Sequence, residues 1–408
     1  YSNNKKRFKD YFSANEGIKT GENNRFIRFW FEVSRNKCGL FGQSKKWISH
    51  SKGGEFRRWY GNLLWVVNWE NNGLEMRSSG KAGFQGKINY GEIGGVWTKI
   101  SNTYFSTRLQ PKGSTFDSAC PGFFQKNKIS HLEGLALLSS SSIQLLIKLI
   151  NPTMNFQVGN IANLPMPEGS DWKESSKLVA EKLIGIAKSD WDEYEISKDF
   201  KYLNLLDTKF YTNNLSTTYK KLRSSWKEKT NEMQRLEVVN NRIFIDAYGL
   251  QDELKPDIKM HQISLKCNPA YRYGKGVDDY VQENKLRSDT IKELISYAVG
   301  CIFGRYSIDH QGLIIASQGE TVADFLKIVN KPSFMPDDDN VIPFLQLDWF
   351  EDDITARFKK FLKVTFGDEN FEENLRFIEK SIGKDIRKYF LSDFYKDHIQ
   401  NYKKRPIY

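Results

Sequence analysis

The pattern of apolar residues changes at the sequence Leu164-Pro165-Met166-Pro167. Before this point, from about residue 25 to 128, the apolar runs are short and are separated by glycines, which is typical of strands joined by loops. After it, residues 171–250 repeat their apolar side chains at the spacing of long amphipathic helices, and the two prolines separate the two patterns. We therefore expect an α+β protein, in which a strand-rich mixed α/β domain is followed by a helical spacer and a mainly helical C-terminal domain.

These patterns also predict the bounds of elements and domains. We expect buried strands over residues 29–33 and 63–67, and one amphipathic helix over 131–149. Further helices are expected over 290–303, 320–330, 349–365, 371–381 and 384–402. The predicted domains are a linker (1–19), the strand-rich domain (20–168), the helical spacer (169–255) and the C-terminal domain (256–408). A chain of 408 residues is longer than one core usually supports, which agrees with several domains.

All of the net charge lies in the first 120 residues. They contain 20 Lys and Arg against 9 Asp and Glu, a net charge of +11, so the other 41 of the 61 basic side chains are balanced by the other 41 of the 50 acidic ones. The same 120 residues contain six of the ten tryptophans. A domain that concentrates cations and flat aromatic side chains is suited to a polyanion, and we expect double-stranded DNA as its partner.

Two stretches of this domain carry the residues that we expect to contact DNA. In the first, two glycines let backbone amides approach an anion, paired arginines clamp phosphates or read guanine, and two aromatic rings stack on a base or anchor the loop. The second is a polar and basic stretch that follows Trp97. The predicted DNA-binding residues are Lys46, Lys52, Gly53, Gly54, Arg57, Arg58, Trp59, Tyr60, Lys99, Ser101, Arg108 and Lys112. The alternative is a solvated basic surface without a ligand.

The sequence lacks a recognisable catalytic motif. An adenine-specific methyltransferase needs a glycine-rich turn for S-adenosylmethionine and an Asn-Pro-Pro-aromatic tetrapeptide that holds the flipped base. Asn268-Pro269-Ala270-Tyr271 lacks the second proline and is more typical of a turn initiated by proline. The acidic residues at 337–339 and 351–353 lack the arrangement of a nuclease metal site, and the histidines lack ligand spacing. We expect no catalytic residue, no cofactor and no metal in this chain.

The composition predicts a cytoplasmic protein. The mean hydropathy is −0.58 and no long apolar run is present, so we expect no transmembrane helix and no membrane partner. The four cysteines lie far apart, which is typical of reduced thiols rather than of a disulfide framework. The chain begins at Tyr1 in Lys-rich sequence, and we expect it to be a fragment of a longer protein.

Several segments resemble known families of DNA methyltransferases. Residues 151–165 look like the end of a target recognition domain of type I specificity subunits and TaqI-like adenine methyltransferases, in which a helix and a Leu-Pro exit precede a helical spacer. More closely, the chain resembles the PglX family, the adenine-specific DNA methyltransferases of BREX phage-defence systems. The segments that carry this resemblance are residues 20–26, 52–62 (KGGEFRRWYGN), 67–71, 97–101 and 298–307.

The resemblance implies that the chain is the C-terminal portion of such a protein. It would contain the target recognition domain and would select a DNA sequence for methylation of an adenine at N6. The methyltransferase domain, with its S-adenosylmethionine site, would precede Tyr1, so we expect this chain to be inactive alone. The implied partners are double-stranded DNA, the methyltransferase domain, and other defence subunits or a phage DNA-mimic inhibitor.

Two alternatives come from other classes of protein. One is a protein-docking scaffold, whose charge-neutral helices bind other subunits of a defence complex and whose basic face binds acidic DNA-mimic proteins. The other is an RNA-binding module, in which the aromatic side chains stack on single-stranded bases. A salt titration of binding to duplex DNA distinguishes the first alternative, because a DNA-binding protein loses affinity steeply as salt rises.

Overall fold

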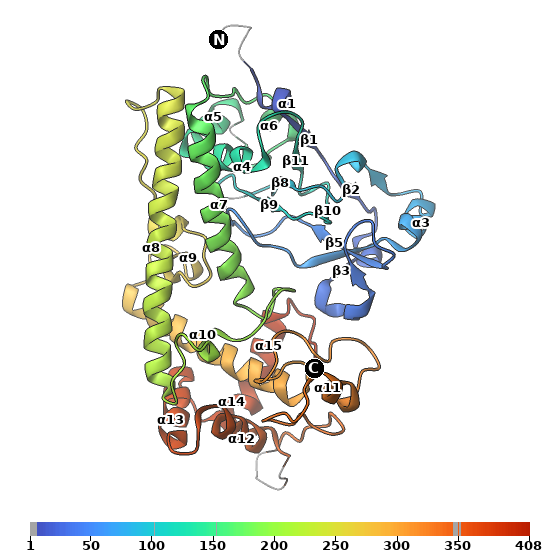
Figure 1. Cartoon of the computed structure of the whole chain (residues 1–408), viewed down its shortest axis with the longest axis vertical. Coiled ribbons are helices and arrows are strands. Elements are labelled where there is room, and N and C mark those ends of the chain that lie inside the picture. The colour runs from blue at the N-terminus through green and yellow to red at the C-terminus, as the bar shows by residue number, and fades with distance from the viewer. Residues whose placement is uncertain (1–5, 102, 152, 346–349, 351) are drawn as a thin grey trace. The chain divides into compact units, whose positions relative to one another are not determined.

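The structure is a computed structural model that describes residues 6–101, 103–151, 153–345, 350 and 352–408. It contains long helices and several small sheets, which confirms the predicted α+β class (Figure 1). The chain forms two compact units. Unit 1 comprises Tyr1–Trp191 and Lys229–Lys266, and unit 2 comprises Asp192–Glu228 and Cys267–Tyr408. The first and last parts of the predicted spacer (169–255) therefore belong to the same unit as the strands.

Unit 1 contains all the described strands. They are β1 (Phe12–Asn15), β2 (Ile18–Lys19), β3 (Ile27–Phe29), β4 (Cys38–Gly39), β5 (Trp47–Ser51), β6 (Trp65–Asn68), β7 (Gly83–Phe84), β8 (Gly94–Trp97), β9 (Thr107–Gln110), β10 (Thr115–Phe116) and β11 (Gly122–Gln125). One sheet is antiparallel, with the order β1-β11-β8-β9. The second has the order β10-β5-β6-β3, and β4 also pairs with β5. In this sheet β4 and β10 run parallel to β5, whereas β2 and β7 form a separate ribbon.

The tryptophans of this unit belong mainly to its core. Trp30, Trp47, Trp59, Trp69 and Trp97 are each at most 9% exposed. One apolar cluster contains residues from both sheets and from the segments between them: Ile18, Phe26, Ile27, Ile48, Val67, Trp69, Met76, Tyr90, Val96, Phe116, Cys120 and Phe124. The concentration of aromatic residues near the N-terminus thus supplies the bulk that holds small sheets together, rather than a surface for stacking bases.

The helices α4 (His131–Ser139) and α5 (Ser141–Ile150) occupy the place of the single helix predicted over 131–149. That prediction is wrong, because the chain bends by 71° at Ser140. The Ser140 hydroxyl accepts a hydrogen bond from the Ile143 N–H (3.3 Å) and donates one to the Leu137 carbonyl (2.7 Å), so it ends one helix and caps the next. Among the described residues no single helix is long and apolar enough to cross a membrane; only this bent pair taken together reaches that length and composition.

Helix α4 packs on the antiparallel sheet, and a glycine makes this packing possible. A Cβ atom at Gly95 in β8 would lie 2.2 Å from a ring carbon of Phe123 in β11. The Phe123 ring also fills the space beside Gly134 of α4. Because β8, β11 and α4 meet at this ring, only a residue without a side chain fits at position 95.

The N-terminal segment is folded where the structure describes it. Residues 6–19 contain α1 (Phe8–Tyr11), β1 and β2, and β1 pairs with β11. Phe8 and Phe12 are 0% exposed, and their rings stack at 4.5 Å. Residues 6–19 of the predicted linker (1–19) therefore pack against the sheet, since two apolar anchors within polar sequence are enough to bind them there. The strand predicted over 29–33 is corrected: β3 ends at Phe29 and a 3-10 turn, η1 (Trp30–Glu32), follows.

The remaining helices of unit 1 are α2 (Asn23–Phe26), α3 (Glu70–Ser78), α6 (Val158–Ala162), α7 (Asp171–Asp192) and the C-terminal part of α8 (Leu215–Tyr248). The 3-10 turns are η2 (Arg35–Lys37), η3 (Lys87–Asn89) and η5 (Met260–Gln262). The structure confirms a long helical pair within residues 171–250. Trp172 of α7 contacts Phe244 of α8, with ring centroids 5.7 Å apart, and Tyr248 donates a hydrogen bond to the Pro165 carbonyl (2.6 Å).

Among the described residues of unit 2, the regular elements are all helices or helical turns, and they are joined by long loops. Its elements are the N-terminal part of α8, η4 (Asn204–Leu206), α9 (Pro269–Arg272), α10 (Asp279–Ile302), α11 (Val322–Ile328), α12 (Ile354–Phe366), α13 (Phe371–Ile382), α14 (Ile386–Tyr389), a π-helical turn (Phe390–Phe394) and α15 (Tyr395–Asn401). The helix predicted over 290–303 starts earlier, where the Asp278 carboxylate accepts hydrogen bonds from the N–H groups of Tyr280 and Val281. Trp349 and Glu351, at the start of the helix predicted over 349–365, lie outside the described residues.

Candidate nucleic-acid interface

The paired arginines that we expected to contact DNA lie inside unit 1. Arg57 and Arg58 follow β5 and are 6% and 4% exposed. The Arg58 guanidinium forms an ion pair with the Glu237 carboxylate of α8, and the Trp59 indole N–H donates to the same carboxylate (3.1 Å). The Arg58 backbone N–H donates to the Ser264 hydroxyl (2.9 Å). This arginine therefore joins the strand-rich part of unit 1 to α8 and to the segment that follows it.

Arg57 makes a second link of the same kind. Its Nη1 lies 3.4 Å from a carboxylate oxygen of Asp190 in α7, and its guanidinium lies 5.0 Å from the centre of the Trp191 ring. Asp190 is 0% exposed and also accepts a hydrogen bond from the Lys266 N–H (2.7 Å). We call Arg57, Arg58, Asp190 and Glu237 the arginine clamp. Each of its two charge pairs is desolvated and neutralises itself, so it holds the fold instead of a ligand.

The structure places five of the DNA-binding candidates inside the protein. Arg57, Arg58, Trp59, Tyr60 and Arg108 are all buried. Arg108 lies on β9, where its guanidinium approaches the Thr98 hydroxyl (3.4 Å) and the Cys120 sulfur (3.7 Å), and burial raises the pKa of that thiol to about 11. Sequence reasoning missed the buried ion pairs of Arg57 and Arg58 because their acidic partners lie more than 100 residues away along the chain.

A buried polar cluster that contains Asp117 and His50 lies beside Lys52 and the turn formed by the two glycines. The Lys52 ammonium lies 3.0 Å from the Asp117 carboxylate, which also contacts His50 Nε2 at 3.5 Å. Burial alone would raise the pKa of Asp117, but the hydrogen bond and charge of His50 and the charge of Lys52 bring it well below its ordinary value. The Gly54 N–H donates to the Thr98 hydroxyl (3.3 Å), which fixes the turn. The Lys52 ammonium is thus already paired with the buried Asp117 carboxylate.

The other predicted cations divide into paired and unpaired ones. Lys46 contacts Glu70 (2.8 Å) and Lys99 contacts Glu16 (2.5 Å). Ser101, beside Lys99, is half-buried, and its hydroxyl bonds Thr103 (3.2 Å). Lys112 is exposed, and within the part of the chain that the structure describes it contacts no carboxylate. Of the twelve predicted residues, Lys112 is therefore the cation that remains available to an anionic partner.

Lys112 belongs to a group of exposed cations that three chain segments bring together. Backbone hydrogen bonds join these segments: the Phe41 N–H donates to Gly113 (2.7 Å), Gly113 donates to Gly91 (2.8 Å), and Gly91 donates to Ser114 (3.1 Å). The segments are residues 35–45, 86–93 and 111–114. The exposed cations on them are Arg35, Lys37, Lys45, Lys87 and Lys112, and we call this group the basic edge.

The basic edge concentrates positive charge among few acidic residues. Among the described residues none of its five cations contacts a carboxylate; Lys45 donates to the Asn36 backbone carbonyl (2.6 Å). Glu92 is the one acidic residue in the three segments. The DNA-binding residues predicted from the sequence do not include Arg35, Lys37, Lys45 and Lys87. The sequence nevertheless indicates a local excess of cations, because it contains no Asp or Glu between Glu32 and Glu55.

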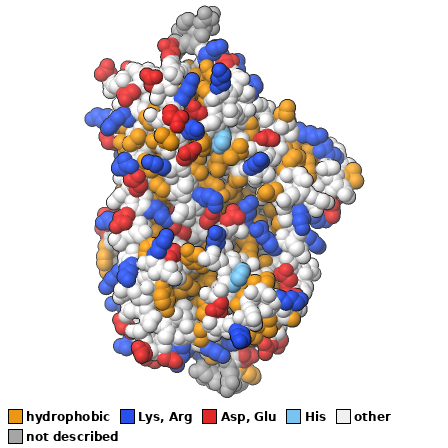
Figure 2. All heavy atoms as spheres, viewed as in Figure 1, with side chains coloured by type: hydrophobic (Ala, Val, Ile, Leu, Met, Phe, Trp, Pro, Cys, Tyr) orange, Lys and Arg blue, Asp and Glu red, His pale blue; other side chains and the backbone are white. Residues whose placement is uncertain are grey.

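Figure 2 shows one face of the molecule, on which Lys and Arg side chains are intermixed with apolar and acidic side chains.

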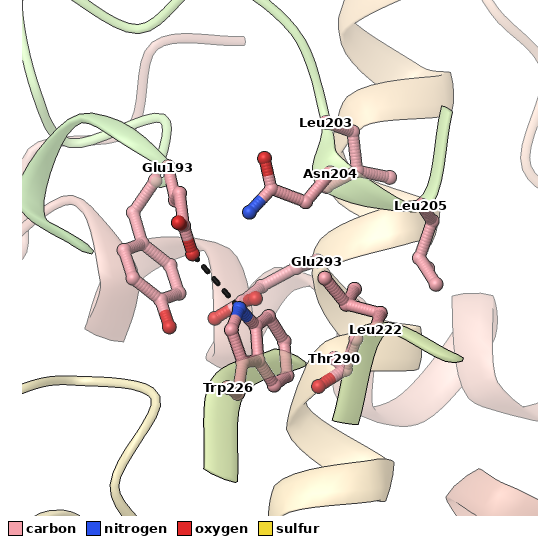
Figure 3. Close-up of a pocket in the computed structure, with 9 residues that line it drawn as sticks. Glu193, Leu203, Asn204, Leu205, Leu222, Trp226, Thr290 and Glu293 are labelled. Atoms are coloured by element: carbon pink, nitrogen blue, oxygen red, sulfur yellow. Dashed lines mark hydrogen bonds between the residues drawn. The ribbon is translucent and has the colours of Figure 1, made fainter. Parts of the chain in front are cut away.

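Unit 2 contains a small hollow that does not resemble a substrate site. Its volume is about 220 Å³, part of which is open to solvent, and the Trp226 indole N–H donates across its wall to Glu193 (2.9 Å; Figure 3). The lining residues are Glu193, Tyr194, Leu203, Asn204, Leu205, Leu222, Trp226, Thr290 and Glu293. Glu293 also contacts Arg272 (3.2 Å), so this carboxylate takes part in an internal ion pair.

The near-match to a methyltransferase motif is a helix cap in the structure. The Asn268 side chain accepts a hydrogen bond from the Ala270 N–H (3.2 Å), and Pro269 begins α9. This confirms the expected turn initiated by proline. Among the described residues, no three His, Cys, Asp or Glu side chains are grouped so that they could hold a metal ion.

Comparisons with known proteins identify relatives over almost the whole chain. It is 35% identical over 413 residues to the "Adenine-specific methyltransferase BrxX" of Escherichia coli O9:H4 (strain HS), covering 97% of this chain and 33% of that protein. It is 36% identical over 432 residues to the "Adenine-specific methyltransferase PglX" of Lacticaseibacillus casei (strain Zhang), covering 98% of this chain and 34% of that protein. The chain thus spans about a third of the length of these relatives. No protein-family model matches it.

Proposed function

We propose that this chain, a homologue of a segment of the BrxX and PglX adenine-specific methyltransferases, binds double-stranded DNA and selects the sequence in which an adenine is methylated. The name of each relative describes an enzyme that modifies adenine, and such an enzyme needs a part that holds the duplex and chooses the site. In this proposal the strand-rich part of unit 1 is the target recognition domain of a phage-defence methyltransferase. S-adenosylmethionine would bind to a part of the parent protein outside this chain.

The basic edge is the observation that carries this proposal. Five exposed cations that contact no carboxylate among the described residues lie on segments with one acidic residue, and contacts between such cations and phosphates release counterions from DNA. Each phosphate contact contributes about 0.9 to the slope of log affinity against log salt concentration. We therefore expect a slope of magnitude about 4–5 if all five cations contact phosphates.

The arginine clamp supports this assignment in a different way. It joins the strand-rich part of unit 1 to α7 and to the C-terminal part of α8, which belong to the same compact unit as the basic edge. A recognition domain must keep a fixed position on the DNA relative to the enzyme that it serves. The two buried ion pairs of the arginine clamp provide this rigidity. Such a rigid connection is what a helical spacer would supply.

The remaining predicted contacts stay part of the proposal as secondary sites. Lys46, Lys52 and Lys99 are partly exposed although each contacts a carboxylate, and Gly53, Gly54 and Ser101 lie beside them on the loops after β5 and β8. A phosphate that approaches these lysines competes with Glu70, Asp117 and Glu16. We expect their contribution to binding to be smaller than that of the basic edge.

Selection from a library of randomised duplexes tests the function. We expect the chain to enrich duplexes that share a short motif containing an adenine, and a labelled duplex with that motif to resist competition by a scrambled duplex. Retention of every duplex equally would contradict sequence selection while leaving DNA binding in place. Absence of any binding at low salt, together with capture of an acidic DNA-mimic protein, would favour the docking scaffold instead.

Competition by a single-stranded RNA tests the alternative that the chain is an RNA-binding module. Most of the tryptophans of unit 1 are core residues, so among the residues that the structure describes these rings are not available for stacking on single strands. We expect the RNA to compete less well than a duplex of the same length. Stronger competition by RNA would contradict the proposed function.

A further inference from the structure

The turn at residues 86–90, on one of the three segments of the basic edge, presents an aliphatic side chain to solvent. Ile88 is 87% exposed, the largest exposure of any large apolar side chain among the described residues. A single exposed apolar residue is common on protein surfaces and needs no explanation by itself. The position of Ile88 differs from that case because of how its turn is held and what surrounds it.

The base of this turn is fixed on both sides. Tyr90 is buried and its hydroxyl donates to the Gln85 carbonyl (2.7 Å), while the Asn89 and Tyr90 N–H groups donate to Gly86 (2.9 Å) and Lys87 (3.2 Å). Gly86 adopts a φ of +63°, and a Cβ there would lie 2.7 Å from the Glu16 carbonyl oxygen. The turn is therefore pressed against the domain and holds Ile88 at a rigid tip.

Cations flank this tip. Lys87 precedes Ile88, and the turn that carries Lys112 is joined to the same segment through the hydrogen bonds between Gly91 and residues 113 and 114. Leu40, which is 40% exposed, packs beside Gly113. An apolar point between unpaired cations fits a ligand that is anionic at its edges and apolar between them, and a duplex has this arrangement of phosphates around stacked bases.

We propose that Ile88 is a wedge that contacts the bases of the bound duplex from a groove and partly unstacks one base step, while Lys87 and Lys112 bind the adjacent phosphates. This inference rests on the proposed function and names the part of the basic edge that reaches the bases. Proteins that deform DNA insert aliphatic side chains between base steps in this way, flanked by cations that bind the backbone. The wedge supplies affinity that depends on base stacking and not on salt.

Substitution of Ile88 separates these two contributions. Loss of a buried aliphatic contact corresponds to a tenfold or larger change in affinity, so we expect Ile88→Ala to weaken binding of the selected duplex about tenfold. The slope against salt concentration should stay the same, because no charge is removed. Lys87→Ala should instead lower the magnitude of the slope by about 1. Ile88→Leu keeps an aliphatic tip and should restore most of the affinity.

Fluorescence of 2-aminopurine at each position of the duplex reports unstacking directly. We expect wild-type protein to raise the emission at one base step and Ile88→Ala to leave it unchanged at saturating protein. Leu149→Ala is the matched control, since Leu149 is 71% exposed on α5 of the same unit. Equal affinity and equal emission for wild type and Ile88→Ala would overturn the wedge and leave DNA binding intact. Failure of the wild-type chain to bind duplex would overturn both.

Discussion

Removing the carboxylate of Glu237 should destabilise unit 1 strongly and leave the intrinsic affinity for DNA unchanged. The Arg58 side chain is 5% exposed and the Glu237 side chain 3%, so Glu237→Ala leaves a buried guanidinium without its counter-charge. It also removes the acceptor of the Trp59 indole N–H. Breaking a buried ion pair on one side costs about 3–5 kcal/mol, and we expect a loss of about 4 kcal/mol in the free energy of unfolding.

Three companion variants make this estimate specific. Glu237→Gln keeps an acceptor for the indole, and its loss should be smaller than that of Glu237→Ala. Replacing both Arg58 and Glu237 by Met removes the charges together and should recover much of the stability, because well-packed apolar pairs often match buried ion pairs. Glu70→Ala is the control, since the Lys46–Glu70 pair is exposed and should contribute about 0–1 kcal/mol.

Urea unfolding followed by tryptophan emission measures these changes. Eight of the ten tryptophans belong to unit 1, so this signal reports mainly the unit that contains the clamp. DNA affinity is then measured under conditions where each variant is folded. If Glu237→Ala unfolds at the same urea concentration as wild type, or if folded Arg58→Ala has lost DNA affinity, the clamp is not an internal anchor and the reasoning fails.

Three further predictions concern other buried groups. Burial, and then the charge of Arg305, lower the pKa of His398 to about 4, below the value of about 6.5 in the unfolded chain. The stabilisation is therefore complete above pH 6.5, and the free energy of unfolding falls by at most about 3 kcal/mol as the pH drops to 4. Thermal unfolding of His398→Phe should show a weaker dependence on pH over this range. Arg387→Ala leaves the Asp353 side chain, which is 2% exposed, without its bidentate partner and should cost unit 2 about 3–5 kcal/mol, whereas an unchanged melting temperature would contradict a desolvated pair. Gly95→Val should prevent folding of the antiparallel sheet, and a native circular dichroism spectrum for this variant would show that the packing there is looser than described.

The sequence predicted the class of each region because that information is local. The long pair α7 and α8 and most helices of unit 2 follow from helical periodicity, and the strand-rich region follows from its glycines and short apolar runs. The break at Ser140 was missed because the leucines of residues 131–149 keep a helical spacing on both sides of it. Here the hydrogen bonds of the Ser140 side chain decide where one helix ends and the next begins, although the apolar spacing continues across this position.

The candidate site was harder to predict because it depends on contacts between distant residues. Nothing in the segment around Arg57 and Arg58 shows that Asp190 and Glu237 neutralise it, and an Arg-Arg-aromatic run has the same composition whether it faces DNA or a buried carboxylate. The basic edge has the opposite property. Its cations are unremarkable one by one, and only the hydrogen bonds of Gly91 and Gly113 bring three separate segments together.

The dependence of duplex affinity on salt, measured for wild type and for a variant with all five basic-edge cations replaced by Ala, shows whether the basic edge binds DNA. We expect the variant to fold normally, because these side chains are exposed, and its slope to be smaller in magnitude by about 4–5. A variant of Lys46, Lys52 and Lys99, whose cations already contact carboxylates, should change the slope by less. An unchanged slope in the five-cation variant, with binding retained, would contradict the assignment of this surface to DNA.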